Sequence, residues 1–261
     1  ITVRVPKALD AMDPGILYKY RSLAGIDRDR VMETFSNSSV YFSSPDQFND
    51  PFDCKVELLL DGTEEEWKQY IGEKLKIYRP SLSPADRLAE MNRIIRSGNY
   101  KKLDPTISTR AAKEAGVYCV SAVNDDILMW SHYANAHRGI CIGFRAKVQD
   151  YFFRRSQEVK YFETYPSTRI FDSDEKRMET ALLAKSAHWS YEKEYRIIEP
   201  HGSGVHQFPE ELLVEVILGC QISDDDKKTV IEWAHKCLHR PRVFIARKKS
   251  REFGLSIEEA L

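Results

Sequence analysis

The feature that most limits the fold is a series of roughly seven or eight short strand-like runs, which helices interrupt at irregular intervals. The runs are rich in apolar and β-branched residues and cover residues 17–21, 40–42, 117–121, 139–144, 159–161, 194–198, 213–218 and 242–245. No glycine-rich turn leads from a strand into a helix, as a doubly wound fold would require. The pattern therefore predicts an α+β fold with a mixed or mainly antiparallel sheet and flanking helices.

Helical patterns fill the intervals between these runs. Helices are predicted at about 26–36, 128–135 and 224–238, and a long, highly charged helical stretch begins at Thr63, where Glu66 completes a capping box. A chain of 261 residues can bury one substantial core. We therefore expect a single domain over 1–261 that carries a helical insertion at about 63–115.

Charge and cysteine usage narrow the class of protein. Lysine plus arginine (39) nearly balances aspartate plus glutamate (40), so no global field attracts the chain to nucleic acid or to a membrane. No apolar run approaches the roughly 20 residues of a membrane span. The five cysteines are widely spaced and form no C-x-x-C pair. These features predict a cytoplasmic protein with free thiols, without a zinc site and without a membrane partner.

The first block of interest is the strand-like run 18–22. If it is extended, Lys19 and Arg21 share one face, and Tyr18 and Tyr20 share the other. Two cations fixed on one strand suit a phosphate or diphosphate, for which an arginine offers a bidentate fork. The alternative is an edge strand that its charges protect from aggregation.

The second block, 43–53, combines two prolines with short polar side chains and predicts a structured loop. Ser43 and Ser44 are candidates for hydrogen bonds to a ligand. The candidates for chelation of a hard cation are Asp46, Asn49, Asp50 and Asp53. The alternative is a set of Asx turns that fix the loop through its own backbone.

The third block places Asp126, Trp130, Tyr133 and His137 at helical spacing, with His132 on another face. Trp130, His132 and Tyr133 together suit a stacking wall for a base or a nicotinamide ring, although structural roles are the alternative.

The fourth block runs from residue 185 to 198. In its extended part Glu192, Glu194 and Arg196 share one face, so a carboxylate would be held ionised beside a guanidinium. A salt-bridged surface strand is the alternative.

Together these blocks resemble a bacterial family catalogued as domain of unknown function twenty-nine seventy-one. Its members read roughly LY(K/H)Y(R/T)S, FSSPxxFNDPF, MWSHYAxxHxG and WxYExEYR, and the corresponding residues here are 17–22, 42–52, 129–139 and 189–196. More distantly, the order of Lys19 or Arg21, Ser43 and Glu194 resembles the ADP-ribosyltransferase fold, which includes bacterial toxins that modify DNA bases. Lys19 stands where many family members carry histidine.

The resemblance implies an ADP-ribosyltransferase-like enzyme that uses NAD as substrate, needs no metal, and passes ADP-ribose to a nucleic acid, a protein or water. A toxin or phage-defence effector would fit that chemistry. The implied site has Glu194 and His132 as catalytic residues and the NAD-binding residues Lys19, Tyr20, Arg21, Ser43, Asn49, Asp50, Trp130, Tyr133 and Arg196. Two alternatives stay open: a metal-dependent hydrolase or nuclease that uses Asp50, Asp53, His132 and Glu194, and a non-catalytic ligand-binding module.

Overall fold

A computed structural model describes residues 15–102, 114–146, 152–199 and 202–260 and confirms the α+β class. Its centre is an eight-stranded sheet in which only β12 and β13 pair in parallel among the described strands, so the sheet is mixed and mainly antiparallel. In spatial order the strands are β14 (Leu255–Glu259), β13 (Arg242–Lys248), β12 (Leu213–Leu218), β5 (Ile140–Arg145), β1 (Ile16–Arg21), β4 (Gly116–Ser121), β10 (Glu194–Glu199) and β6 (Gln157–Glu158).

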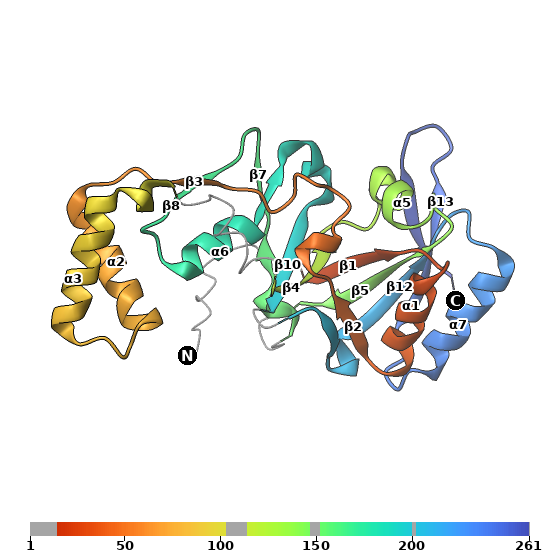
Figure 1. The fold of residues 1–261 in the computed structure, drawn as a ribbon. Helices are drawn as coiled ribbons and strands as arrows, with labels where there is room; N and C mark the ends of the chain where they lie inside the picture. The colour runs from red at the N-terminus through yellow and green to blue at the C-terminus, as the bar shows by residue number, and fades with distance from the viewer. Residues whose placement is uncertain (1–14, 103–113, 147–151, 200–201, 261) are drawn as a thin grey trace.

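Both faces of the sheet are apolar, and the two-residue period of a strand divides its side chains between two cores. In β5, Ile140 and Ile142 enter the larger core, where α1 (Ile26–Ser36) and α7 (Asp224–Lys236) pack on the sheet. Cys141 enters the other core, which α5 (Ile127–Tyr133) covers. Figure 1 shows α5 on the opposite side of the sheet from α1 and α7.

The parallel pair β12 and β13 follows from α7, because parallel neighbours need a long connection and a helix provides it. Ser223 caps this helix by accepting a hydrogen bond from the backbone of Asp226. The predicted helix at 224–238 is therefore present, and it ends two residues earlier at Lys236.

A helical arm projects from the body of the protein (Figure 1), and it consists of α2 (Glu64–Tyr78) and α3 (Pro84–Ser97). The predicted capping box is formed, since Thr63 and Glu66 exchange side-chain to backbone hydrogen bonds. Trp67 and Ile71 bury themselves in a small core of the arm's own. Residues 103–113 of the predicted helical stretch lie outside the described residues.

The remaining elements are short. Paired strands β2 (Ser39–Phe42) and β11 (Gly204–Gln207), β3 (Glu57–Leu59) and β8 (Ser167–Arg169), and β7 (Lys160–Phe162) and β9 (Ala184–Ser186) lie outside the main sheet. The other helical elements are η1 (Pro45–Gln47), η2 (Asn99–Lys102), η3 (Phe153–Arg155), α6 (Asp174–Leu182), η4 (Ala187–Glu192) and η5 (Glu210–Leu212).

The five cysteines carry free thiols, and Cys54, Cys141 and Cys237 are buried. Across the described ranges, none of the helices combines the length and the apolar character that crossing a membrane would demand.

Candidate functional site

The main sheet opens between β1 and β4, and a cavity of about 560 Å³ occupies the opening. β1 pairs with β5 along its whole length but meets β4 only where Tyr18 faces Ser121. All four blocks from the sequence contribute to the wall: Tyr18, Lys19, Tyr20, Arg21 and Ser22; Ser43, Gln47, Phe48, Asn49 and Asp53; Met129, His132, Tyr133 and Asn135; Lys185, Glu192 and Glu194. Segments up to about 175 residues apart thus meet in one place of a size typical for small-molecule sites.

One end of the cavity is cationic. Lys19 reaches across the opening, donates a 2.6 Å hydrogen bond from its Nζ to the carbonyl of Cys119, and lies 4.9 Å from the centre of the Tyr118 ring. This carbonyl belongs to the strand edge that β1 leaves unpaired. Burial, together with the positive charge of Arg21, lowers the pKa of Lys19 to about 8.

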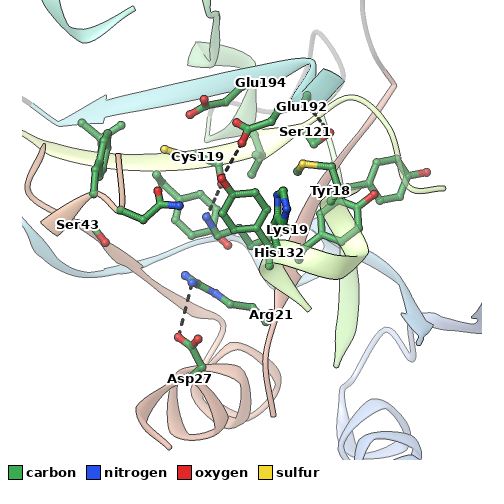
Figure 2. A pocket seen from close by; sticks show the side chains of 18 of the residues that line it. Tyr18, Lys19, Arg21, Asp27, Ser43, Cys119, Ser121, His132, Glu192 and Glu194 are labelled. Atoms are coloured by element: carbon green, nitrogen blue, oxygen red, sulfur yellow. Dashed lines mark hydrogen bonds and ion pairs between the residues drawn. The ribbon is translucent and has the colours of Figure 1, made fainter. Parts of the chain in front are cut away.

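Two arginines complete the cationic end and share one weak counterion. Asp27 lies 3.7 Å from Arg21 and 3.9 Å from Arg30, which stacks over the Tyr41 ring. With Lys19 this end carries three cations and one carboxylate, so two positive charges are in excess. Figure 2 shows Arg21 and Asp27 on the side of the cavity opposite Glu192 and Glu194.

The other end is a buried network of five charged side chains. Lys185 donates hydrogen bonds to Glu192 at 2.5 Å and to Glu194 at 2.7 Å. Arg196 binds Glu194 through Nε at 2.7 Å and both oxygens of Asp53 at 2.8 and 2.9 Å. None of the five is more than 8% exposed. Glu194 and Arg196 therefore share a face of β10, as predicted.

Two cations and three carboxylates leave this network with one excess negative charge, which falls unequally on the two glutamates. Burial raises the pKa of Glu192, and Lys185 offsets this only in part. Burial alone would also raise the pKa of Glu194. The positive charges of Arg196 and Lys185 outweigh this effect and hold the pKa of that carboxyl well below its usual range. Glu192 is thus the carboxyl that most readily takes up a proton, while Glu194 is a fixed negative charge.

Aromatic side chains surround the acidic end. The Tyr133 hydroxyl donates a 2.6 Å hydrogen bond to Glu192. His132 is exposed at the rim, where its Nδ1 lies 3.0 Å from the Tyr191 hydroxyl and its ring meets those of Tyr133 and Trp189 edge to face. This rim offers ring faces and a titratable imidazole beside the carboxylates.

Residues 129–197 match the model of a family described as "Protein of unknown function (DUF2971)". This segment is therefore similar to the DUF2971 family, and the predicted resemblance is confirmed over these residues. The match covers the part of the chain that runs from α5 to β10, which supplies most of the acidic end of the cavity. Comparison with curated proteins gives no significant match. Comparison with solved structures also gives none, so the likeness to ADP-ribosyltransferases remains a prediction.

Three residues predicted to bind a ligand lie outside the cavity wall. Trp130 is fully buried, packs edge to face on Tyr20 and donates its indole N–H to the carbonyl of Asn124, so it supports the wall of the cavity from behind. Arg196 is buried beneath the network and holds carboxylates. Asp50 accepts the indole N–H of Trp189 and fixes its own turn.

The predicted helical face that joins Asp126, Trp130, Tyr133 and His137 is wrong at its far end. α5 ends at Tyr133, and Asn135, Ala136 and His137 follow with φ angles of 47°, 52° and 65°. This left-handed turn brings the His137 ring parallel to Trp130 instead of continuing the helix. Asp126 caps the helix by accepting from the backbone of Leu128 and Met129.

Sequence reasoning gave no role to Lys185, although it joins the two glutamates. The available signal was a lysine at the end of the apolar run 181–184, a position where an unpaired ammonium would be costly to bury. The sequence also implied Glu194 and not Glu192 as the catalytic carboxylate, yet both are almost fully buried and both line the cavity.

The carboxylates proposed for a metal-dependent hydrolase have cationic or backbone partners instead. Asp53 binds Arg196, Glu194 binds Arg196 and Lys185, and Asp50 binds Trp189. In the described part of the chain, no three histidine, cysteine, aspartate or glutamate side chains are grouped to hold a metal ion.

Proposed function

We propose that this cavity binds NAD and that the protein cleaves the bond between nicotinamide and ribose, as the likeness to ADP-ribosyltransferases implies. The observation that carries the proposal is the division of one cavity into a cationic end at β1 and a carboxylate end at η4 and β10. NAD divides its own charge in the same way, with a diphosphate near its middle and a positively charged nicotinamide at one end.

The cationic end suits the diphosphate. Lys19, Arg21 and Arg30 with Asp27 have two positive charges in excess, which is the charge that a diphosphate linkage neutralises. Arg21 and Arg30 hold Asp27 only at 3.7 and 3.9 Å, so their guanidinium groups can turn to phosphate oxygens without breaking a close ion pair.

The carboxylate end suits the reacting sugar. When the bond from ribose C1′ to the nicotinamide nitrogen breaks, its electron pair leaves with the nicotinamide, which becomes neutral, and positive charge develops on the ribose. Glu194 supplies a fixed negative charge near that centre, and Glu192 accepts a hydrogen bond from a ribose hydroxyl. Both act in a site with little water, where such charges have their largest effect.

Aromatic residues at the rim complete the proposal. Tyr133 and Tyr20 both line the cavity and offer a ring surface for nicotinamide, so Tyr20 takes the place that was expected for Trp130 beside Tyr133. His132 lies at the rim, where it can take the proton that an acceptor releases as its nucleophilic atom bonds to C1′. With water as acceptor the products are nicotinamide, ADP-ribose and a proton, and loss of cellular NAD would make the protein a toxin or a defence effector.

The test is nicotinamide release by the full chain, measured by chromatography, together with NAD affinity measured by calorimetry. Glu194→Gln and Glu192→Gln should each lower turnover by about a hundredfold or more while NAD affinity changes much less. Arg21→Ala should weaken NAD affinity more than it lowers turnover, because its contact with the diphosphate is present both before and during the reaction. Glu232→Gln and Arg154→Ala, at exposed positions, are the matched controls.

Two outcomes contradict the proposal. Absence of NAD binding would overturn it entirely. Tight NAD binding without nicotinamide release, with every acceptor class tested, would leave a ligand-binding module in its place.

A further inference from the structure

The hairpin that joins β13 to β14 ends in a concentrated basic segment. Residues 247–253 read Arg-Lys-Lys-Ser-Arg-Glu-Phe, with four cations and one carboxylate, in a chain whose formal net charge is −1. All seven residues are exposed. The tip therefore carries a local excess of positive charge although the chain as a whole is nearly neutral.

Only half of these cations have a carboxylate partner. Arg247 pairs with Glu258 at 2.8 Å, and Lys249 lies 3.5 Å from Glu252. Lys248 and Arg251 make no ion pair within the described part of the chain. Two long cationic side chains thus stand in solvent, free to meet an anion without first losing a partner.

An aromatic ring stands beside these cations. Phe253 is 103% exposed, so it contributes nothing to either core of the sheet. The hairpin itself does not depend on this ring, because β13 and β14 pair at five positions from Phe244 and Glu259 to Lys248 and Leu255. A phenylalanine at the tip carries an exposed apolar area that folding does not explain.

The base of the hairpin is fixed to the helix that borders the cavity. Ala246 and Leu255 pack with Met129 and Trp130 of α5 in one buried cluster. Figure 1 shows β13 and α5 next to each other on the same side of the molecule. A ligand held at the tip would therefore lie beside the rim of the cavity.

The left-handed turn after α5 lies near both the basic tip and the cavity wall. Burial lowers the pKa of His137 in this turn, and the charge of Lys248 lowers it further, which places the basic tip near the turn. Asn135, two residues earlier, lines the cavity.

We propose that the tip formed by residues 247–253 binds single-stranded nucleic acid, with Phe253 stacked on a base and Lys248 and Arg251 on the flanking phosphates. Unstacked bases present ring faces to an aromatic side chain, and a strand of phosphates matches a short row of cations. A duplex hides its ring faces. An anionic membrane would need a larger apolar surface than one phenylalanine provides.

The experiment measures binding of the full chain to a fluorescein-labelled 20-nucleotide DNA of mixed sequence, by fluorescence anisotropy at several salt concentrations and without NAD. Each phosphate neutralised contributes about −0.7 to the slope of log affinity against log salt. Lys248→Ala with Arg251→Ala should therefore make the slope less negative by about 1.4. Phe253→Ala should weaken binding about tenfold and leave the slope unchanged.

The matched control is Lys228→Ala with Lys236→Ala, which removes two exposed lysines from α7 and should change neither quantity. The proposal is overturned if the wild-type chain does not bind, if this control weakens binding as much as the hairpin variant does, or if Phe253→Ala has no effect. Equal affinity for duplex of the same length, for polyglutamate or for phosphatidylserine vesicles would also overturn it. Because NAD is absent, the result does not depend on the proposed reaction.

Discussion

Lys185 and Glu192 form a 2.5 Å hydrogen bond in a place where neither side chain is more than 8% exposed. The same ammonium holds Glu194 at 2.7 Å and lies 3.7 Å from Asp53. Three carboxylates would repel one another without this cation, and Arg196 alone would have to neutralise them. The network therefore holds the acidic end of the cavity in one arrangement, and Lys185 is its centre.

The first prediction concerns Lys185→Met, which keeps the length of the side chain and removes its charge. The carboxylates left without it should lower the free energy of unfolding by about 3–5 kcal/mol, as removal of one partner from a buried ion pair does. Chemical denaturation measures the change. Lys160→Met, at an exposed position, should change the free energy by less than about 0.5 kcal/mol. If Lys185→Met also lowered the free energy of unfolding by less than about 0.5 kcal/mol, the network would be solvated.

The two glutamates should give stability opposite dependences on pH. The pKa of Glu194 is lowered by folding, so its contribution is present above its unfolded pKa of about 4.3 and is lost as pH falls further. The pKa of Glu192 is raised, so folding loses free energy as pH rises above about 4.3 and this carboxyl ionises. At pH 7, Glu194→Gln should destabilise the protein, whereas Glu192→Gln should be nearly neutral or stabilising. Urea denaturation from about pH 2 to 8 measures both dependences, and equal losses in the two variants at pH 7 would contradict the assignment.

The fold was largely predictable from the sequence because its strands carry strong signals. The runs 117–121 and 213–218 are mainly apolar and rich in β-branched residues, and both occur as predicted. The strands that were missed, such as β3 and β11, are short and partly exposed, so local composition hardly distinguishes them from loops.

The site was predictable in its location but not in its contacts. Four polar blocks could be placed in one cavity, but the single pairing of Tyr18 with Ser121 that opens the sheet depends on long-range packing. The burial of Trp130 behind the cavity wall, instead of in the wall beside Tyr133, has a similar origin. Helical spacing shows which residues share a face, yet not that α5 turns its tryptophan to the core.

A third prediction uses the lowered pKa of Lys19. Loss of its proton above pH 8 should remove one positive charge from the cationic end, so the Kd for NAD should rise as pH increases through about 8. Lys19→Arg should bind NAD with little change up to about pH 9.5, because an arginine stays protonated. Calorimetric titration at half-unit pH intervals measures this. A wild-type profile as flat as that of the arginine variant would exclude Lys19 from the diphosphate contact.

A fourth prediction separates Trp130 from the ligand. Trp130→Phe keeps most of the buried volume but loses the hydrogen bond to Asn124, so it should destabilise the protein by about 1–3 kcal/mol and leave NAD affinity nearly unchanged. Tyr133→Leu removes a ring from the cavity wall and should weaken NAD binding about tenfold. If the tryptophan variant lost affinity as well, Trp130 would contact the ligand as the sequence first suggested. If the tyrosine variant kept its affinity, Tyr133 would not be part of the stacking wall.

The last prediction concerns the left-handed turn between α5 and β5. Ala136 has a φ of 52°, where its Cβ costs roughly 1 kcal/mol that glycine avoids. Ala136 is exposed, so replacing it removes no core contact. Ala136→Gly should therefore raise the free energy of unfolding by up to about 1 kcal/mol, even though glycine gives the unfolded chain more freedom.

The matched control is Ala85→Gly, at an exposed position in the first turn of α3, where the same substitution should lower the free energy of unfolding by about 0.5–1 kcal/mol. If Ala136→Gly raises the free energy of unfolding and Ala85→Gly lowers it, the turn stores backbone strain. The strained turn places Asn135 in the cavity wall and His137 against Trp130. Destabilisation by both substitutions would instead mean that Ala136 occupies its conformation without strain, and the turn would then have no special energetic cost beside the site.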